Sequence, residues 1–204
     1  LAEIASIRNS DINTYSKSMK FIADQGGYAI RIGSTQRRKI NFEYDRVIDY
    51  SFSDIKNPKN DFLLSFFANF IIGSSSGIVD ISSLNDVPVG LVNCPFYRFQ
   101  QARKRVSFIP KIIMNSKNEV LKRSTYLEKM GEYDDQKDIN SIFTRYNWRH
   151  LDNDENDILE ITKYFYKNII SNSNNTQDEI KFEFDHEGLK IFKPFVDKYP
   201  ELMN

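Results

Sequence analysis

The sequence predicts an α/β fold in which helices flank a mostly parallel β-sheet. Short apolar segments alternate with segments whose apolar residues recur every three or four positions, through the first half of this 204-residue chain. Several apolar segments end at a glycine or a small polar residue, which is typical of strands that run into turns. Because strands separated by helices are joined by crossovers, they lie parallel in one sheet.

The composition is that of a globular protein and excludes several classes of function. Hydrophobic residues make up 40% and charged residues 27% of the chain, which is too apolar for a disordered protein. The 28 Lys and Arg residues balance the 28 Asp and Glu residues, so no nucleic-acid partner is expected. The single cysteine, Cys94, excludes an internal disulfide, and His150 and His186 stand alone, so no metal site is expected. No apolar run is long enough to cross a bilayer, and no signal peptide is expected at the start.

The first expected helix begins at the capping segment Arg8-Asn9-Ser10-Asp11 and ends at Gly26-Gly27. Its apolar face has residues three and four positions apart, namely Ile12, Tyr15, Met19 and Ile22. Two short strands follow, over residues 28–32 and 47–50. Arg31 interrupts the first strand and Gly33 closes it.

A second helix is expected to be capped by Asn60 or Asp61, and it carries Phe62, Leu63, Phe66 and Phe67. A strand over residues 70–72 comes next and runs into the turn Gly73-Ser74-Ser75-Ser76-Gly77. This turn opens a helix over residues 78–84, which Asn85-Asp86 ends. A strand over residues 89–92 then leads to Asn93.

The second half of the chain has a less regular pattern. One strand is expected within residues 106–114 and a helix over 154–170, while residues 131–157 are acidic and polar with scattered aromatics. A polar linker over 171–178 precedes a short terminal helix that carries Leu189, Phe192 and Val196. We therefore expect an α/β core over residues 1–120 and a helical or irregular extension over 121–204 that packs on the same domain.

Several polar residues follow the expected strands directly, namely Gly33, Asp49, residues 73–77 and Asn93. In a parallel sheet with right-handed crossovers, all strand-to-helix turns lie at the carboxyl ends of the strands, where ligands bind. We therefore expect these turns to converge on one site.

The turn from Gly73 to Gly77 has two interpretations. Its backbone N–H groups, its serine hydroxyls and the positive end of the following helix suit a phosphate, and its glycines permit close approach and unusual φ angles. The turn lacks the lysine of a nucleotide-hydrolysing P-loop and the G-x-G-x-x-G spacing of a dinucleotide site. The alternative is a serine-rich turn that binds nothing.

The charged residues near the expected site have the same two interpretations. Arg31 could bind a phosphate or form an ordinary salt bridge at the sheet edge. Arg8 and Asn9 could line a cleft or belong only to a helix cap. The basic segment 97–105 could attract phosphates of a donor or a lipid-linked acceptor, or be a solvated loop. The sequence identifies no catalytic base, and Asp11, Asp49 and Asp80 remain alternatives.

The order of these motifs resembles a family of bacterial glycosyltransferases associated with surface polysaccharide synthesis. The resemblance covers about the first 120 residues and lies in the order and spacing of short motifs, with Ile32 where the family usually has Met. The helix after Gly77 also departs from the family in carrying Asp80. The motifs that carry the resemblance are Arg8-Asn9-Ser10-Asp11-Ile12 with Tyr15, Tyr28-Ala29-Ile30-Arg31-Ile32-Gly33, Val47-Ile48-Asp49-Tyr50-Ser51, Asp61-Phe62, residues 70–77, Val87-Pro88-Val89 and Asn93.

The resemblance implies a glycosyltransferase of the GT-B type, in which two Rossmann-like domains enclose the active site. This chain would be the C-terminal half, with a Rossmann-like nucleotide-sugar-binding core over residues 1–120, and an N-terminal domain would lie upstream of Leu1. The resemblance implies no bound metal, and because the nucleotide-sugar donor is a substrate, no cofactor is expected. The resemblance further implies a cytoplasmic enzyme, peripheral to the inner membrane, that acts on a glycan or lipid-linked acceptor.

In this hypothesis each site residue has a role. Arg31, Gly33 and residues 73–77 bind the donor diphosphate, Asp49 and Tyr50 contact the ribose or base, and Arg8, Asn9 and Asn93 line the cleft. The alternative is a non-catalytic α/β module that binds a phosphorylated small molecule or a protein partner.

Overall fold

The computed structural model describes residues 8–33, 38–95, 106–130, 136–171, 182–184 and 190–203. A five-stranded sheet crosses the centre of the molecule in the order β3-β4-β5-β9-β8. All neighbours in this sheet are parallel except β8 and β9, which are antiparallel. Its strands are β3 (Ile71–Gly73), β4 (Val89–Cys94), β5 (Val106–Pro110), β8 (Phe182–Phe184) and β9 (Lys190–Phe192).

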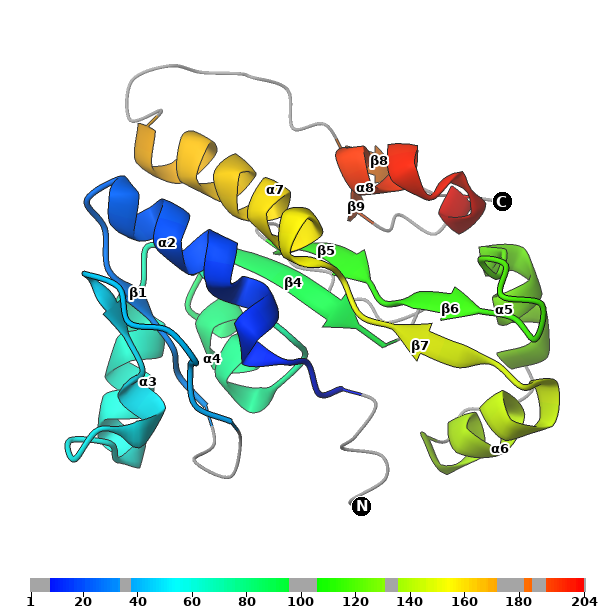
Figure 1. Cartoon of the computed structure of the whole chain (residues 1–204), viewed down its shortest axis with the longest axis horizontal. Helices are drawn as coiled ribbons and strands as arrows, with labels where there is room; N and C mark the ends of the chain where they lie inside the picture. Colours follow the sequence, from blue (N-terminus) through cyan, green and yellow to red (C-terminus); the bar gives the residue numbers. More distant parts are fainter. Residues whose placement is uncertain are drawn as a thin grey trace.

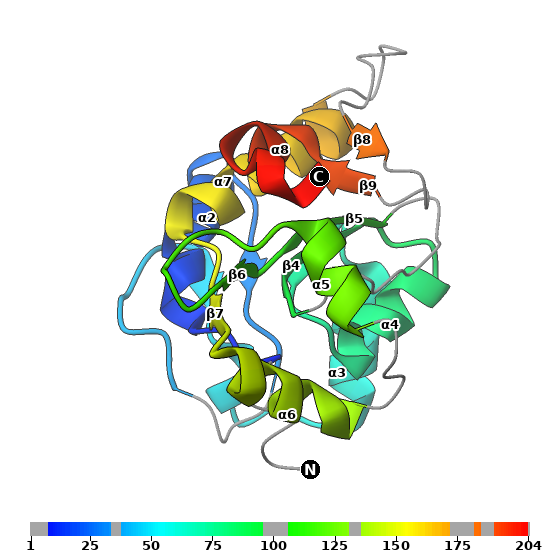
Figure 2. The ribbon, with the colours of Figure 1, turned by 90° about the vertical axis from the view of Figure 1, so that its right-hand side faces the viewer.

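Helices cover both faces of this sheet, as Figures 1 and 2 show for α7 on one face and α4 on the other. The sequence-based expectation of a mostly parallel sheet flanked by helices is therefore confirmed. The helices are α2 (Ser16–Asp24), α3 (Pro58–Phe67), α4 (Gly77–Leu84), α5 (Arg123–Met130), α6 (Gln136–Tyr146), α7 (Glu155–Phe165) and α8 (Lys193–Lys198). Short 3₁₀ segments are η1 (Ile12–Tyr15), η2 (Tyr50–Phe52) and η4 (Pro200–Met203), and α7 continues as a π-helical segment, η3 (Tyr166–Ser171).

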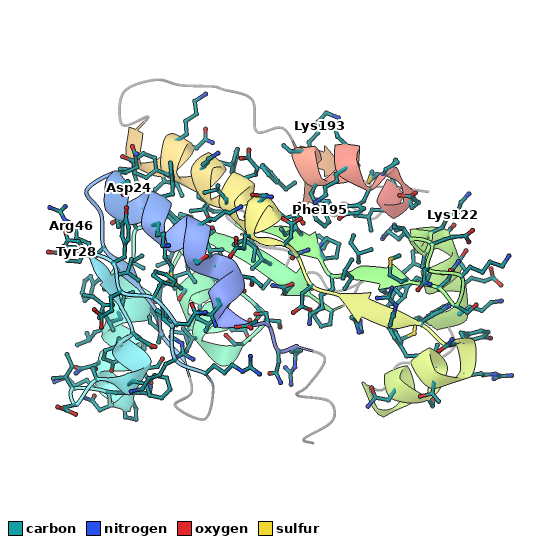
Figure 3. All side chains as sticks on the ribbon, in the orientation of Figure 1. Asp24, Tyr28, Arg46, Lys122, Lys193 and Phe195 are labelled. Carbon is teal, nitrogen blue, oxygen red and sulfur yellow. The ribbon has the colours of Figure 1, made fainter. Side chains whose placement is uncertain are left out.

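Two smaller sheets lie beside the central one. The strands β1 (Ala29–Ile30) and β2 (Val47–Ile48) form a parallel pair of their own, so the central sheet does not include them. Arg46 precedes β2 in a left-handed conformation (φ 60°), and its guanidinium lies 5.8 Å from the ring of Tyr28 (Figure 3). The strands β6 (Ile112–Met114) and β7 (Arg149–Leu151) form an antiparallel pair, which extends the molecule away from β1 and β2 (Figure 1).

The core is built around β4, every residue of which is buried. Val89, Leu91 and Val92 are at most 1% exposed, and Phe165 of α7 covers the strand at Gly90. A Cβ atom at Gly90 would lie 3.1 Å from Cε2 of Phe165 and 2.4 Å from Cδ1 of Ile72 on the neighbouring strand. The absence of a side chain at this position therefore lets α7 approach the sheet.

Several sequence-based element boundaries were wrong. Helix α3 begins at Pro58, because Oδ1 of Asn57 accepts the N–H of Asn60 at 2.9 Å, so neither Asn60 nor Asp61 is the cap. The single strand expected within residues 106–114 is divided at Lys111 into β5 and β6. The acidic and polar region over 131–157, for which the sequence predicted no element before residue 154, contains α6 and β7.

The expected terminal helix was also wrong in part. Phe192 belongs to β9, and only the residues after it are helical, while Leu189 lies outside the described residues. The reason is tertiary, because Ile191 pairs with Phe108 of β5 and so draws this segment into the central sheet. Strands from both expected regions, 1–120 and 121–204, thus lie in one sheet.

Within the described ranges, no helix combines the length and apolarity that a membrane span requires.

Replacing Gly90 by alanine should lower the free energy of unfolding by about 1–3 kcal/mol, because the added methyl displaces Ile72 and Phe165 from the packed interface between β4 and α7. Urea unfolding would measure the loss. The matched control is Gly77→Ala, since a Cβ atom there has no neighbour within 4 Å. Equal stability losses in the two variants would contradict the tight packing at Gly90.

Candidate ligand site at the carboxyl ends of the central strands

The turn between β3 and α4 leaves the start of a helix open. Ser76 is the N-cap residue of α4, but its side chain makes no capping hydrogen bond. The first intrahelical bond is donated by the N–H of Asp80 to the carbonyl of Ser76, so the N–H groups of residues 77–79 precede it. The space where a side chain at Gly77 would lie is empty to 4 Å. These N–H groups, at the positive end of the helix dipole, can receive an anion.

The hydroxyl groups of the turn are also unused. Ser74 and Ser75 are partly buried and Ser76 is exposed, and no hydroxyl of the three makes a hydrogen bond within the described part of the chain. One expectation about this turn was wrong, because neither Gly73 nor Gly77 has a positive φ angle. The two glycines therefore contribute only by having no side chain, and neither adopts a left-handed backbone conformation.

Asn93 lies at the same edge of the sheet as this turn. Gly73 pairs with Leu91, so the residues after Gly73 leave β3 beside the end of β4. Asn93 is fully buried and left-handed (φ 53°), where the pairing of β4 with β5 shifts register. Its side-chain nitrogen Nδ2 has no hydrogen-bond partner among the described residues. A buried amide donor without a partner is costly, so this group is suited to an oxygen atom supplied from outside the chain.

Asn153, just before α7, holds Asn93 in place through a reciprocal pair of hydrogen bonds. The backbone N–H of Asn93 donates to Oδ1 of Asn153 at 2.6 Å, and the backbone N–H of Asn153 donates to Oδ1 of Asn93 at 2.7 Å. Nδ2 of Asn153 also donates to the carbonyl of Pro110 at 2.7 Å. The ends of β4 and β5 are thereby joined to the start of α7.

A buried lysine lies at the same edge of the sheet. We call Asn93, Asn153, Lys111, Asp152 and Tyr15 the polar layer. Lys111 is 3% exposed and follows β5 directly. Its Nζ donates to the carbonyl of Asn9 at 2.7 Å and lies 2.7 Å from Oδ1 of Asp152. The Asp152 side chain is 38% exposed, so this ion pair runs from the interior to the surface. Asn9, expected to line the site, thus contributes its backbone carbonyl.

Tyr15 connects the same layer to the first helical segment. Its hydroxyl lies 3.2 Å from Oγ of Ser10. Burial raises the pKa of Tyr15, while Ser10 and the nearby amide of Asn93 lower it by a smaller amount. The Asn93 amide is close enough to act on this pKa but does not reach hydrogen-bond geometry. Tyr15 therefore stays a neutral hydroxyl at physiological pH.

The imidazole of His150, on β7, is uncharged and lies near Lys111 and Asp152. Burial lowers the pKa of His150 to about 4 and outweighs the hydrogen bond to Pro95, which raises it; the ammonium of Lys111 lowers the pKa further, and Asp152 raises it. Its Nε2 lies 3.1 Å from the carbonyl of Pro95, which can only accept, so Nε2 carries the proton. The ring stacks on Phe143 with centroids 4.4 Å apart.

Arg31 and Asp49 were expected to bind a donor, but in the structure they bind each other. Their NH1 and Oδ1 atoms are 2.9 Å apart, and the Arg31 side chain is only 5% exposed. The second carboxylate oxygen of Asp49 accepts the N–H of Ile40 at 2.9 Å. The salt-bridge interpretation of Arg31 is thus the one the geometry favours. Gly33, with a φ of 152°, turns the chain beside this pair, next to Ser51.

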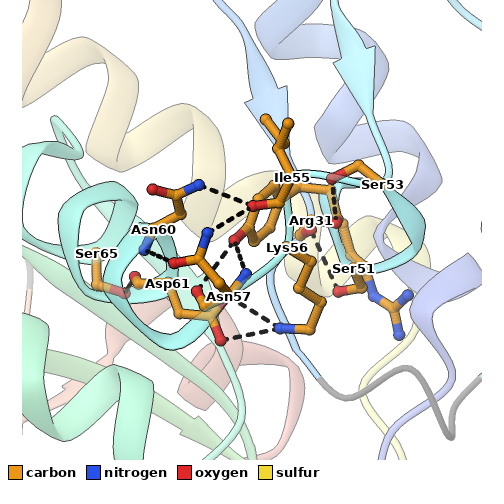
Figure 4. A network of polar contacts seen from close by, with 10 residues as sticks. Arg31, Ser51, Ser53, Ile55, Lys56, Asn57, Asn60, Asp61 and Ser65 are labelled. Carbon is orange, nitrogen blue, oxygen red and sulfur yellow. Dashed lines mark hydrogen bonds and ion pairs between the residues drawn. The ribbon is translucent and has the colours of Figure 1, made fainter.

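Tyr50 points into its own loop. Its hydroxyl accepts the N–H of Asn57 at 3.1 Å, and the ring faces Nζ of Lys56 at 5.5 Å. Lys56 is paired with Asp61 at 2.9 Å, and Figure 4 shows this network of short contacts at the start of α3. Tyr50 is 3% exposed and fully engaged, so its position favours a structural role.

The loop after residue 37 contacts both Asp49 and Asn13. The N–H of Asn41 donates to Oδ1 of Asn13 at 3.1 Å, next to the N–H of Ile40 that binds Asp49. Arg8, the first residue of the capping segment, is partly buried. The basic segment 97–105 and His186 lie outside the described residues.

Sequence reasoning missed Lys111, His150, Asp152 and Asn153. Lys111 could have been noticed as a charge within an otherwise apolar run, by the argument that singled out Arg31. The other three come from the acidic and polar region over 131–157, where the sequence assigned no site role, and the pairing of β6 with β7 brings them to the ends of β4 and β5. No group of three or more potential metal ligands lies together in the described ranges.

Comparison with known proteins adds no relative. No protein-family model, curated protein or solved structure matches this chain.

Replacing Asn153 by alanine should lower the free energy of unfolding by about 2–4 kcal/mol, because the change leaves the N–H of Asn93 and the carbonyl of Pro110 buried without partners. Chemical unfolding would measure it. Asn156→Ala is the control, since that exposed side chain accepts a hydrogen bond from Lys17 at the surface. A comparable small loss in both variants would mean that the Asn93–Asn153 pair does not hold the strand ends.

The low pKa of His150 predicts a specific pH dependence of stability. The unfolded histidine binds a proton near pH 6.5 and the folded one near pH 4, so stability should fall as the pH drops from about 6.5 to about 4. The loss attributable to this residue is on the order of 3 kcal/mol. His150→Gln keeps a side-chain N–H donor but cannot titrate, so its stability should depend less on pH over this window. An unchanged pH profile in that variant would contradict a buried, neutral His150.

Proposed function

We propose that this chain is the donor-binding half of a GT-B glycosyltransferase that builds surface polysaccharide or another glycan. The observation that carries the proposal is the open N-terminus of α4, with three serine hydroxyls that make no hydrogen bond among the described residues, at the sheet edge where the unpartnered amide of Asn93 also lies. A nucleotide sugar is the ligand that the resemblance implies. Its diphosphate suits the helix N-terminus, and its hydroxyl or phosphate oxygens suit the amide donor.

The chemical step in this proposal is sugar transfer. The acceptor hydroxyl oxygen forms a bond to the anomeric carbon of the donor sugar, and the bond from that carbon to the diphosphate oxygen breaks. The electron pair of the broken bond goes to the departing nucleoside diphosphate, and the hydroxyl proton goes to a base that we do not assign in this chain. Negative charge therefore grows on the diphosphate in the transition state, where N–H and O–H donors at residues 74–77 stabilise it.

The geometry changes the proposed role of two residues. Arg31 would have to leave Asp49 to reach a phosphate, so we assign this ion pair to positioning the loop around Ile40. Tyr50 is assigned to the loop before α3. The donor contacts therefore rest on the turn from Gly73 to Gly77 and on Asn93.

Binding measurements test the proposal directly. Titration calorimetry with UDP, GDP, CMP and ADP sugars should find one nucleotide class that binds, and its nucleoside diphosphate should bind more tightly than its monophosphate. Ser74→Ala combined with Ser75→Ala should weaken diphosphate binding by roughly tenfold through the loss of two hydrogen bonds. Ser116→Ala, in an exposed turn, is the control. If no nucleotide sugar binds, the proposal fails.

Asp80 gives a second, independent test. Its carboxylate lies in the first turn of α4, where it competes with an incoming anion for the helix dipole. Asp80→Asn should therefore tighten diphosphate binding by about two- to fivefold. The gain should diminish at high ionic strength. Unchanged or weaker binding would place the diphosphate elsewhere.

The alternative is a non-catalytic module that binds a phosphorylated small molecule at the same turn. The absence of an assigned base in the chain is compatible with it. Tight nucleotide binding without sugar transfer by the full-length protein would favour this alternative over the enzyme.

A further inference from the structure

Helix α3 exposes its apolar side and buries its polar side. The interior side carries Ser65, which is 1% exposed and donates to the carbonyl of Asp61 at 2.7 Å, while Asp61 itself pairs with Lys56. The solvent side carries four large apolar residues. Their exposed fractions are 46% for Phe62, 38% for Leu63, 40% for Phe66 and 73% for Phe67. Surface helices normally show the reverse arrangement.

The aromatic residues form one continuous surface. The rings of Phe62 and Phe66 stack with centroids 5.8 Å apart, and Phe66 meets Phe67 edge to face at 5.0 Å. Ile55, just before the start of the helix, is 68% exposed as well. The exposed area of the three phenylalanines is on the order of 300 Å². We call the four residues 62, 63, 66 and 67 the α3 face.

We propose that the α3 face binds the α3 face of a second copy of this chain, with the two helices antiparallel across a twofold axis. A twofold interface brings the same surface together from both subunits, so the two faces contribute on the order of 600 Å² of aromatic surface. This area can form the apolar centre of an interface of ordinary size, with a polar rim around it. Each subunit then covers the residues that the other leaves exposed.

The charges of α3 favour the antiparallel arrangement. Lys59 lies at the second position of the helix, where the dipole disfavours a cation, and it has no partner within the described residues. The last turn of α3 carries no basic residue. In an antiparallel pair, Lys59 of each copy reaches the carboxyl end of the other helix, where a cation is favoured. An anionic membrane is a poorer partner, because the only other lysine near the helix start, Lys56, is neutralised by Asp61.

Sedimentation velocity over a range of protein concentrations tests this proposal, which does not depend on the proposed function. The wild-type chain should dimerise in the micromolar range. Phe66→Ser and Phe67→Ser should each weaken the dimer by at least about tenfold, as removal of a central aromatic does in other interfaces. Ile170→Ser is the matched control, because that exposed residue lies at the far end of the segment after α7.

A substitution at Lys59 tests the argument from the charges of α3. Lys59→Glu should weaken the dimer several-fold and leave the monomer at least as stable, because an acidic residue suits the first turn of its own helix. A monomer at all concentrations would overturn the proposal, as would a dimer that only Ile170→Ser weakens. A monomeric chain that binds neutral lipid vesicles through Phe67 would overturn it in favour of a membrane.

Discussion

The reciprocal hydrogen bonding of Asn93 and Asn153 is the interaction on which the rest of the structure depends. It joins the end of β4, all of whose residues are buried, to the segment just before α7. A third hydrogen bond, from Nδ2 of Asn153 to the carbonyl of Pro110, adds the end of β5. Both asparagines are almost completely buried, so every donor or acceptor left unmatched would be costly. Three segments that are up to 60 residues apart in the sequence are thereby fixed at one sheet edge.

Further polar contacts lie at the same edge of the sheet. With β4 and β5 held together, Lys111 is directed toward Asn9 and Asp152. His150 is then held in a desolvated position that keeps it neutral. The one buried donor that this layer leaves without a partner is Nδ2 of Asn93, within the described residues that surround it. A ligand oxygen at this point would complete a network that the protein otherwise satisfies.

The two proposals concern opposite properties of the surface. At the start of α4 the chain leaves polar groups unmatched, which suits a small anionic ligand. On α3 it leaves apolar groups uncovered, which suits another apolar surface. The ion pair of Lys56 with Asp61, drawn in Figure 4, belongs to the polar side of α3, whereas the aromatic residues lie on its exposed side.

The sequence by itself determined the α/β class and the turn from Gly73 to Gly77, because alternation of strands and helices and the chemistry of a glycine- and serine-rich turn are local properties. It also placed Asn93 directly after a strand over 89–92, whereas β4 continues to Cys94 and Asn93 is its second-to-last residue. Only the tertiary structure decided that Arg31 pairs with Asp49, since residues 18 positions apart meet through the pairing of β1 with β2. The same holds for the place of β9 in the central sheet, which Ile191 takes by pairing with Phe108. It also holds for Lys111, Asp152 and Asn153, which long-range pairing brings together. Local patterns specify which elements form, whereas burial and partner choice depend on contacts between distant segments.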